Sequence, residues 1–142
     1  EDYYTEVDHI LNRHPGLKVT FAHFYFLSAD LERAARFLDS HPTVSFDLAP
    51  HVGMFADFSR NPIQAREFFL RYTDRILYGT DMDTRVLERG PSGFEFMRRI
   101  PWLIRSMLES SDEFDWQGVR YKGLGLPLLV LFEQPGCEAC RE

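Results

Sequence analysis

Three short apolar runs, each carrying a histidine or an aspartate near its end, constrain the fold of this chain most strongly. They occupy residues 17–23, 43–48 and 75–81. A short apolar run bounded by turn residues is typical of a strand buried on both faces, as parallel sheets require. Helical spacing of apolar residues fills most of the two intervals between the runs. The pattern therefore predicts an α/β fold with three parallel strands joined by right-handed crossovers.

The three polar residues at the ends of these runs are the candidate active site. His23 and Asp81 close the first and third runs, and Asp47 lies near the end of the second. The carboxyl ends of parallel strands form the edge of the sheet where α/β proteins keep their active sites. Side chains alternate along a strand, so Asp47 is expected to point away from the apolar face, into the polar interior or rim. His51 follows the same strand and is a candidate substrate contact.

Each candidate also has a structural interpretation that the sequence leaves open. An aspartate after a buried strand is a common turn residue, which applies to Asp81. His23 is also consistent with a hydrogen-bonded core histidine, Asp47 with a structural acid, and His51 with an ordinary surface loop. Three further histidines fall on a helix or at the opposite edge of the sheet and are predicted to be structural: His9, His14 and His41.

The remaining segments give coarser predictions. A helix is expected over residues 3–13, and Asn61-Pro62 is expected to open another as capping residue and first helical residue. Ser28 is the predicted N-cap of the helix between the first two strands. Residues 50–60 are expected to form a loop, and residues 94–110 a helix kinked or restarted at Pro101. Residues 112–116 are expected to be a surface connection, followed by a short strand and turn over residues 119–126.

Composition limits the classes of function. With 142 residues the chain amounts to one domain, and it is too short for a complete (β/α)₈ barrel, which takes roughly 250 residues. The formal net charge is -6 and no run of basic residues occurs, which disfavours a nucleic-acid partner. No apolar run reaches membrane-spanning length, and two cysteines do not make a disulfide scaffold. A cytoplasmic protein that does not bind membranes is therefore expected.

Five segments in order resemble one known family. They are HPGLKVTFAH (residues 14–23), VSFD (44–47), DRILYGTD (74–81), MLESSDEF (107–114) and GLGLP (123–127). Together they resemble the carboxyl-terminal part of the amidohydrolase superfamily. The most similar branch is that of metal-dependent hydrolases and decarboxylases related to aminocarboxymuconate-semialdehyde decarboxylase. The resemblance covers residues 1–127 and leaves residues 128–142 as an atypical tail.

This resemblance implies a specific fold and site. The family fold is a (β/α)₈ barrel that holds one or two divalent metals, usually zinc, and the three runs would be strands six, seven and eight. Asp81 would be a metal ligand that also handles the proton of the attacking water. His23 would be a ligand or a catalytic acid/base. The family's remaining histidine ligands lie on strands one and five, for which this chain shows no counterpart.

The tail departs from the family pattern. The family has an amphipathic helix after the position of Pro127, whereas here residues 128–132 are uniformly apolar and a cysteine pair follows. Cys137 and Cys140 are at most half a zinc site, and no role is expected for them.

The expected activity is metal-assisted hydrolysis or decarboxylation of a small organic acid, lactone or amide, with zinc as the expected metal. The chain alone is expected to be inactive, because it offers too few ligands, and either to self-associate or to pair with an amino-terminal half. The alternative is a non-catalytic scaffold or interaction fragment. A weaker alternative is an aspartyl-phosphate phosphohydrolase, since Asp81 and Asp83 have the required spacing. Arg85 stands where that motif needs threonine or valine.

Overall fold

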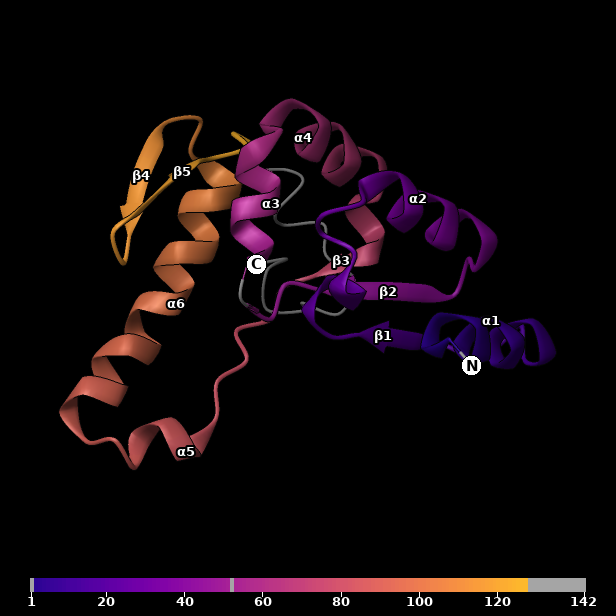
Figure 1. Cartoon of the computed structure of the whole chain (residues 1–142), viewed down its shortest axis with the longest axis horizontal. Helices are drawn as coiled ribbons and strands as arrows, with labels where there is room; N and C mark the ends of the chain where they lie inside the picture. Colours follow the sequence, from indigo (N-terminus) through magenta and orange to yellow (C-terminus); the bar gives the residue numbers. More distant parts are fainter. Residues whose placement is uncertain (1, 52, 128–142) are drawn as a thin grey trace, which may run out of the picture.

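The computed structural model describes residues 2–51 and 53–127, and these residues form helices around a small parallel sheet beside a separate hairpin (Figure 1). The elements in chain order are α1 (Tyr3–Arg13), β1 (Val19–Phe21), the 3₁₀ segment η1 (His23–Phe26), α2 (Leu31–Ser40), β2 (Val44–Asp47), α3 (Met54–Arg60), α4 (Pro62–Arg71), η2 (Thr73–Arg75), β3 (Ile76–Leu77), α5 (Thr84–Leu87), α6 (Pro91–Glu109), β4 (Glu113–Trp116) and β5 (Val119–Lys122). The predictions for residues 128–142, including the apolar run and the cysteine pair, lie outside the described residues.

The three-stranded sheet confirms the predicted strand order and direction. β1 pairs with β2 and β2 with β3, both in parallel, with Phe21 opposite Phe46 and Phe46 opposite Ile76. The strands are shorter than predicted, because the chain leaves the sheet at Ala22 and again after Leu77. His23 and Asp81 therefore lie in the connections that follow their strands, and not within them.

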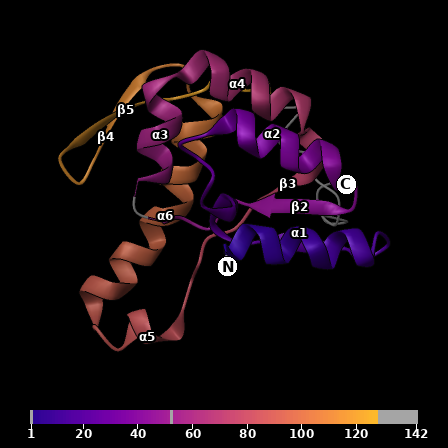
Figure 2. The ribbon, with the colours of Figure 1, turned by 45° about the vertical axis from the view of Figure 1, so that its right-hand side comes forward.

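Helices cover one face of this sheet. Val44, Phe46 and Ile76 are buried on that face, and α2 and α4 lie over it in both ribbon views (Figure 2). The Phe37 ring of α2 stacks on the Phe46 ring at 6.1 Å between centroids. Asp47 alternates away from this face and is only half-buried, as the strand period predicted.

Two predictions about helix boundaries are wrong. The side chain that caps α2 is Asp30, which accepts a hydrogen bond from the Arg33 N–H, whereas Ser28 is buried and bonded elsewhere. Residues 54–60 form helix α3 where a loop was predicted. Gly53 (φ 93°) turns the chain into α3, and the helix buries Met54 and Phe58. A helix of two turns presents too few apolar positions for its period to be recognised in the sequence.

Residues 113–122 form an antiparallel hairpin, so the predicted surface connection over residues 112–116 is also wrong. Gln117 and Gly118 both have positive φ, which is the conformation that a two-residue hairpin turn requires. Helix α6 runs through Pro101 without interruption. Arg99 and Trp102 of α6 lie against the Trp116 ring of β4, at 4.9 Å and 6.0 Å.

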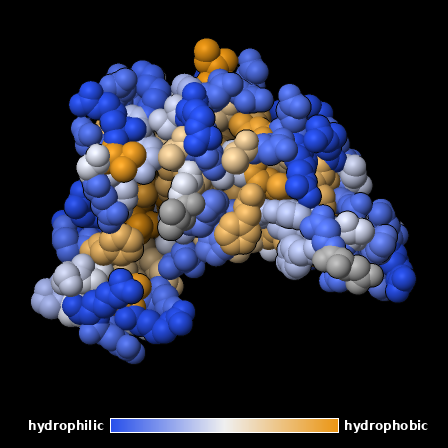
Figure 3. All heavy atoms as spheres, in the orientation of Figure 1, coloured by the Kyte–Doolittle hydropathy of each residue, from blue (hydrophilic) through white to orange (hydrophobic). Residues whose placement is uncertain are grey.

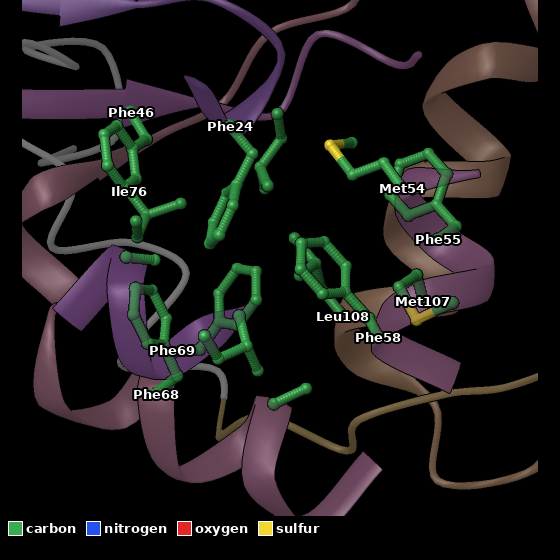
Figure 4. Close-up of a cluster of buried hydrophobic side chains, with 14 of the residues drawn as sticks. Phe24, Phe46, Met54, Phe55, Phe58, Phe68, Phe69, Ile76, Met107 and Leu108 are labelled. Carbon is green, nitrogen blue, oxygen red and sulfur yellow. The ribbon is translucent and has the colours of Figure 1, made fainter. Parts of the chain in front are cut away.

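The core is an aromatic cluster centred on Phe24 (Figure 4). The Phe24 ring lies 5.0–6.1 Å from four other rings, which come from the second strand, α3 and α4: Phe46, Phe58, Phe68 and Phe69. His41 links α1 to the end of α2, because its Nε2 lies 2.6 Å from Asp8 Oδ1 of α1. This contact agrees with the structural role predicted for His41. His9 and His14 are exposed.

One buried hydroxyl in the core lacks a partner. Tyr25 is 3% exposed, and its Oη forms no hydrogen bond with any residue of the described ranges. Burial raises the pKa of this phenol. A buried polar group without a hydrogen bond costs about 1–3 kcal/mol. Tyr25→Phe is therefore expected to raise the free energy of unfolding by about 1 kcal/mol in urea denaturation. A loss of stability would show that the hydroxyl has a partner.

None of the helices in the described part of the chain is long and apolar enough to cross a membrane.

Candidate functional site

The first site element is a left-handed turn directly after β1. Residues His23, Phe24, Tyr25 and Phe26 all have φ between 53° and 57°. This conformation costs L-residues roughly 1–2 kcal/mol each, so tertiary contacts must hold it. Phe24 and Tyr25 provide these contacts through the core, while Phe26 is 61% exposed. The turn therefore places His23 and Phe26 together at the carboxyl edge of the sheet.

Hydrogen bonds fix the orientation of His23. Its backbone N–H donates to Asp47 Oδ1 at 2.8 Å, and its Nδ1 lies 3.0 Å from the Ala49 carbonyl oxygen. A carbonyl only accepts, so Nδ1 carries the proton in this contact. The lone pair of the neutral ring is then on Nε2, where it is able to accept a proton or bind a metal.

Asp47 holds two backbone amides at this edge. The same Oδ1 also accepts the Ala49 N–H at 3.0 Å, so one carboxylate oxygen ties the β1 connection to the β2 connection. Gly79 lies against this arrangement: a Cβ there would be 3.0 Å from Ala49 N and 3.3 Å from Asp47 Cγ. The absence of a side chain at Gly79 lets the chain after β3 run close to Asp47.

His51 lies at the same rim as His23. The two imidazole rings are 6.3 Å apart and nearly perpendicular, and the Phe26 ring is 5.1–5.4 Å from both. His51 Nε2 is 3.5 Å from Ser28 Oγ, and that hydroxyl donates to Asp57 Oδ2 at 2.7 Å. Ser28 and Asp57 thus form a polar support behind His51. The sequence did not indicate it, because the partners are 23 and 29 residues apart.

Asp81 is on the same side of the sheet but in a different environment. It is exposed, has a φ of 51°, and lines a cavity of about 460 Å³ with Pro50, α5 and α6. Within residues 2–51 and 53–127 no hydrogen bond or ion pair joins Asp81 to His23 or Asp47. Hydrogen bonds and ring contacts therefore link His23 with Asp47 and His51, and Asp81 takes part in none of these contacts.

The donor atoms present do not by themselves hold a metal. His23 Nε2 and the Asp81 carboxylate are ligand types that zinc accepts. However, no group of three or more histidine, cysteine, aspartate or glutamate side chains is placed to bind one ion in the described part of the chain. A catalytic zinc site takes three protein ligands. These residues therefore offer part of a donor set and not a complete site.

Comparison with known proteins agrees with this description. A family model described as Amidohydrolase matches residues 4–113. No curated protein and no solved structure matches the chain. The matched segment contains β1, β2 and β3, together with His23, Asp47, His51 and Asp81. The parallel sheet is consistent with part of a barrel of the amidohydrolase type. The chain belongs to the amidohydrolase family.

Proposed function

We propose that this chain is the carboxyl-terminal part of a metal-dependent hydrolase or decarboxylase, with β1, β2 and β3 as strands six, seven and eight of the barrel. The observation that carries the proposal is the arrangement at the carboxyl edge of the sheet. His23 has its Nδ1 proton committed to the Ala49 carbonyl, and the matched family segment also contains Asp81. The five sequence segments named above favour the branch related to aminocarboxymuconate-semialdehyde decarboxylase.

Each residue has a proposed role. Asp81 contributes one ligand, and the other ligands come from an amino-terminal half that carries the histidines of strands one and five. A bound divalent metal of this family would lower the pKa of a water molecule and polarise a substrate oxygen. Through Nε2, His23 exchanges a proton with the substrate, and the Ala49 carbonyl fixes its tautomer. Asp47 positions His23, and His51 contacts the substrate from the support formed by Ser28 and Asp57.

A scaffold or interaction fragment is the second candidate function. It is supported by the incomplete donor set of the described residues. The two candidates differ in what an amino-terminal half would do. A catalytic part gains metal and activity when it is combined with a segment that carries the missing histidines, whereas a scaffold gains neither.

Substitution of His23 tests the catalytic role. In the chain combined with such an amino-terminal half, His23→Gln is expected to lower kcat by about 10²–10⁴, because general acid–base catalysis contributes a factor of that size. Turnover would be followed as release of carbon dioxide or acid from a panel of carboxylic acids, lactones and amides. His9→Gln is the matched control, since His9 is exposed on α1. Equal turnover of the two variants would show that His23 takes no part in the reaction.

Self-association is a further expectation for the chain alone. β1 and β3 are the outer strands of the sheet, and an unpaired strand edge is a known aggregation hazard. Several large apolar side chains are exposed as well, among them Ile10, Leu17 and Tyr78. Light scattering is expected to show species larger than a monomer. A single monomer peak with cooperative thermal unfolding would contradict this expectation.

A further inference from the structure

A second cavity lies between α1 and α2, on the side of the molecule away from α5. Its volume is about 260 Å³. Pockets for drug-sized ligands take roughly 300–1,000 Å³, so this cavity accepts only a small molecule. Figure 3 shows mainly hydrophilic surface over these two helices. No residue lines both this cavity and the one beside Asp81, so the two are separate sites.

The charged side chains that line this cavity balance one another. Asp2 and Asp8 belong to α1 and its N-cap, and Arg33 and Arg36 belong to α2. A ligand that is only anionic would meet the two aspartates, and a ligand that is only cationic would meet the two arginines. Like charges repel, whereas a ligand with one charge of each sign finds a partner on both helices. The charges therefore favour a zwitterion.

The polar groups at the cavity keep hydrogen-bonding capacity for such a ligand. Arg33 Cζ lies 4.1 Å from the centre of the Tyr4 ring, and the guanidinium forms no hydrogen bond or ion pair in the described part of the chain. Stacking on the ring fixes the plane of the guanidinium and leaves its N–H donors unpaired. Asp8 contacts His41 through Oδ1, and among the described residues its Oδ2 has no hydrogen-bond partner.

A buried hydroxyl behind the cavity wall also lacks an acceptor. The Tyr25 ring lies 4.9 Å from both the Tyr4 ring and the Phe37 ring, and these two side chains line the cavity. Burial raises the pKa of the Tyr25 phenol, so the hydroxyl stays protonated and is a donor. Within the described ranges this donor is unpaired. An acceptor that a ligand brings between Tyr4 and Phe37 would therefore satisfy it.

We propose that this cavity binds a zwitterionic amino acid with an apolar side chain, whose carboxylate is held by Arg33 and the Tyr25 hydroxyl and whose ammonium is held by Asp8. Guanidinium binds carboxylate through two parallel N–H···O bonds, and the ammonium donates to Asp8 Oδ2. The apolar side chain of the ligand then lies on Leu27 and Phe37. This inference goes beyond the proposed function and does not depend on it, because it uses no metal and no residue of the candidate active site.

Titration of the 142-residue chain with L-leucine tests the inference, together with two analogues that each lack one charge. Isocaproate lacks the ammonium group, and isoamylamine lacks the carboxylate. Amide and methyl NMR shifts would locate each ligand and give its Kd. Leucine is expected to shift signals of Leu27 and Arg33. It is expected to bind at least about tenfold more tightly than either analogue, because hydrogen bonds to charged groups are the strong ones.

Three variants remove the proposed contacts one at a time. Arg33→Gln is expected to abolish the preference for leucine over isoamylamine, and Asp8→Asn the preference for leucine over isocaproate, because each variant deletes one charge of the site. Tyr25→Phe is expected to weaken leucine binding by about fivefold, the usual effect of one hydrogen bond, and to leave isoamylamine binding unchanged. Arg13→Gln is the matched control, since Arg13 is exposed on α1 and does not line the cavity.

Several outcomes would overturn the inference. Leucine that binds no more tightly than both analogues, or equally well to Arg33→Gln and to Arg13→Gln, would contradict it, as would shifts confined to other parts of the chain. Tighter binding of isocaproate than of leucine would identify a plain anion site in place of a zwitterion site. Unchanged amide spectra away from the cavity would show that each variant is folded.

Discussion

Replacing Phe24 by alanine is expected to lower the free energy of unfolding by about 3–5 kcal/mol, the range for a fully buried phenylalanine. Phe24 is 0% exposed and lies at the centre of the aromatic cluster. It also belongs to the left-handed turn, whose unfavourable backbone conformation is held by such packing. Loss of the ring removes that support, so His23 is expected to leave the Ala49 carbonyl. The substitution therefore links core packing to the site.

Urea denaturation measures the effect, with Phe94→Ala as the control. Phe94 is 61% exposed at the start of α6, so its loss is expected to change stability by less than about 0.5 kcal/mol. Similar losses in both variants would show that the aromatic cluster is not the core of this chain.

Removal of the Asp47 carboxylate is also expected to have a large effect on the free energy of unfolding. Asp47→Ala leaves the backbone N–H groups of His23 and Ala49 without their acceptor. An unsatisfied buried donor costs about 1–3 kcal/mol, so two half-buried donors together are expected to cost about 2–4 kcal/mol. Asp47→Asn keeps an oxygen acceptor of the same shape, so it is expected to lower the free energy of unfolding by less than about 1 kcal/mol.

Hydrogen exchange would resolve this prediction residue by residue. The amides of His23 and Ala49 are expected to lose protection in Asp47→Ala and to keep most of it in Asp47→Asn. Equal loss in the two variants would mean that the negative charge, and not the two hydrogen bonds, is what Asp47 contributes.

The sequence predicted the architecture better than the backbone detail. The strand order, the parallel direction and the helices α1 and α4 follow from periodicity and from the Asn61-Pro62 cap. The left-handed turn did not follow, because bulky residues such as phenylalanine and tyrosine rarely adopt positive φ. Here the packing of Phe24 against residues far along the chain overrides that local preference. The end of β1 was misplaced because this turn begins two residues after it.

The candidate site was predicted in part. His23 and Asp47 meet at the edge of the sheet, as the strand pattern required. Asp81 lines a cavity with α5 and α6, and three residues separate it from the end of β3. The Ser28–Asp57 support carries no local sequence signal. It arises from contacts between distant segments, which the spacing of residues does not encode.

The central claim is that Asp81 belongs to a metal site that residues outside this chain complete. The amount of zinc retained after dialysis tests this claim directly. It would be measured for the isolated chain and for the chain combined with an amino-terminal half that carries the missing histidines. The same combined pair would also be measured with Asp81→Ala and with Asp83→Ala. The isolated chain is expected to retain little zinc, and the pair about one ion, as a three-ligand catalytic site would. Asp81→Ala is expected to abolish retention, while Asp83→Ala, at the neighbouring paired carboxylate, keeps it. Stoichiometric zinc in the isolated chain, or full retention in the Asp81→Ala pair, would contradict the claim.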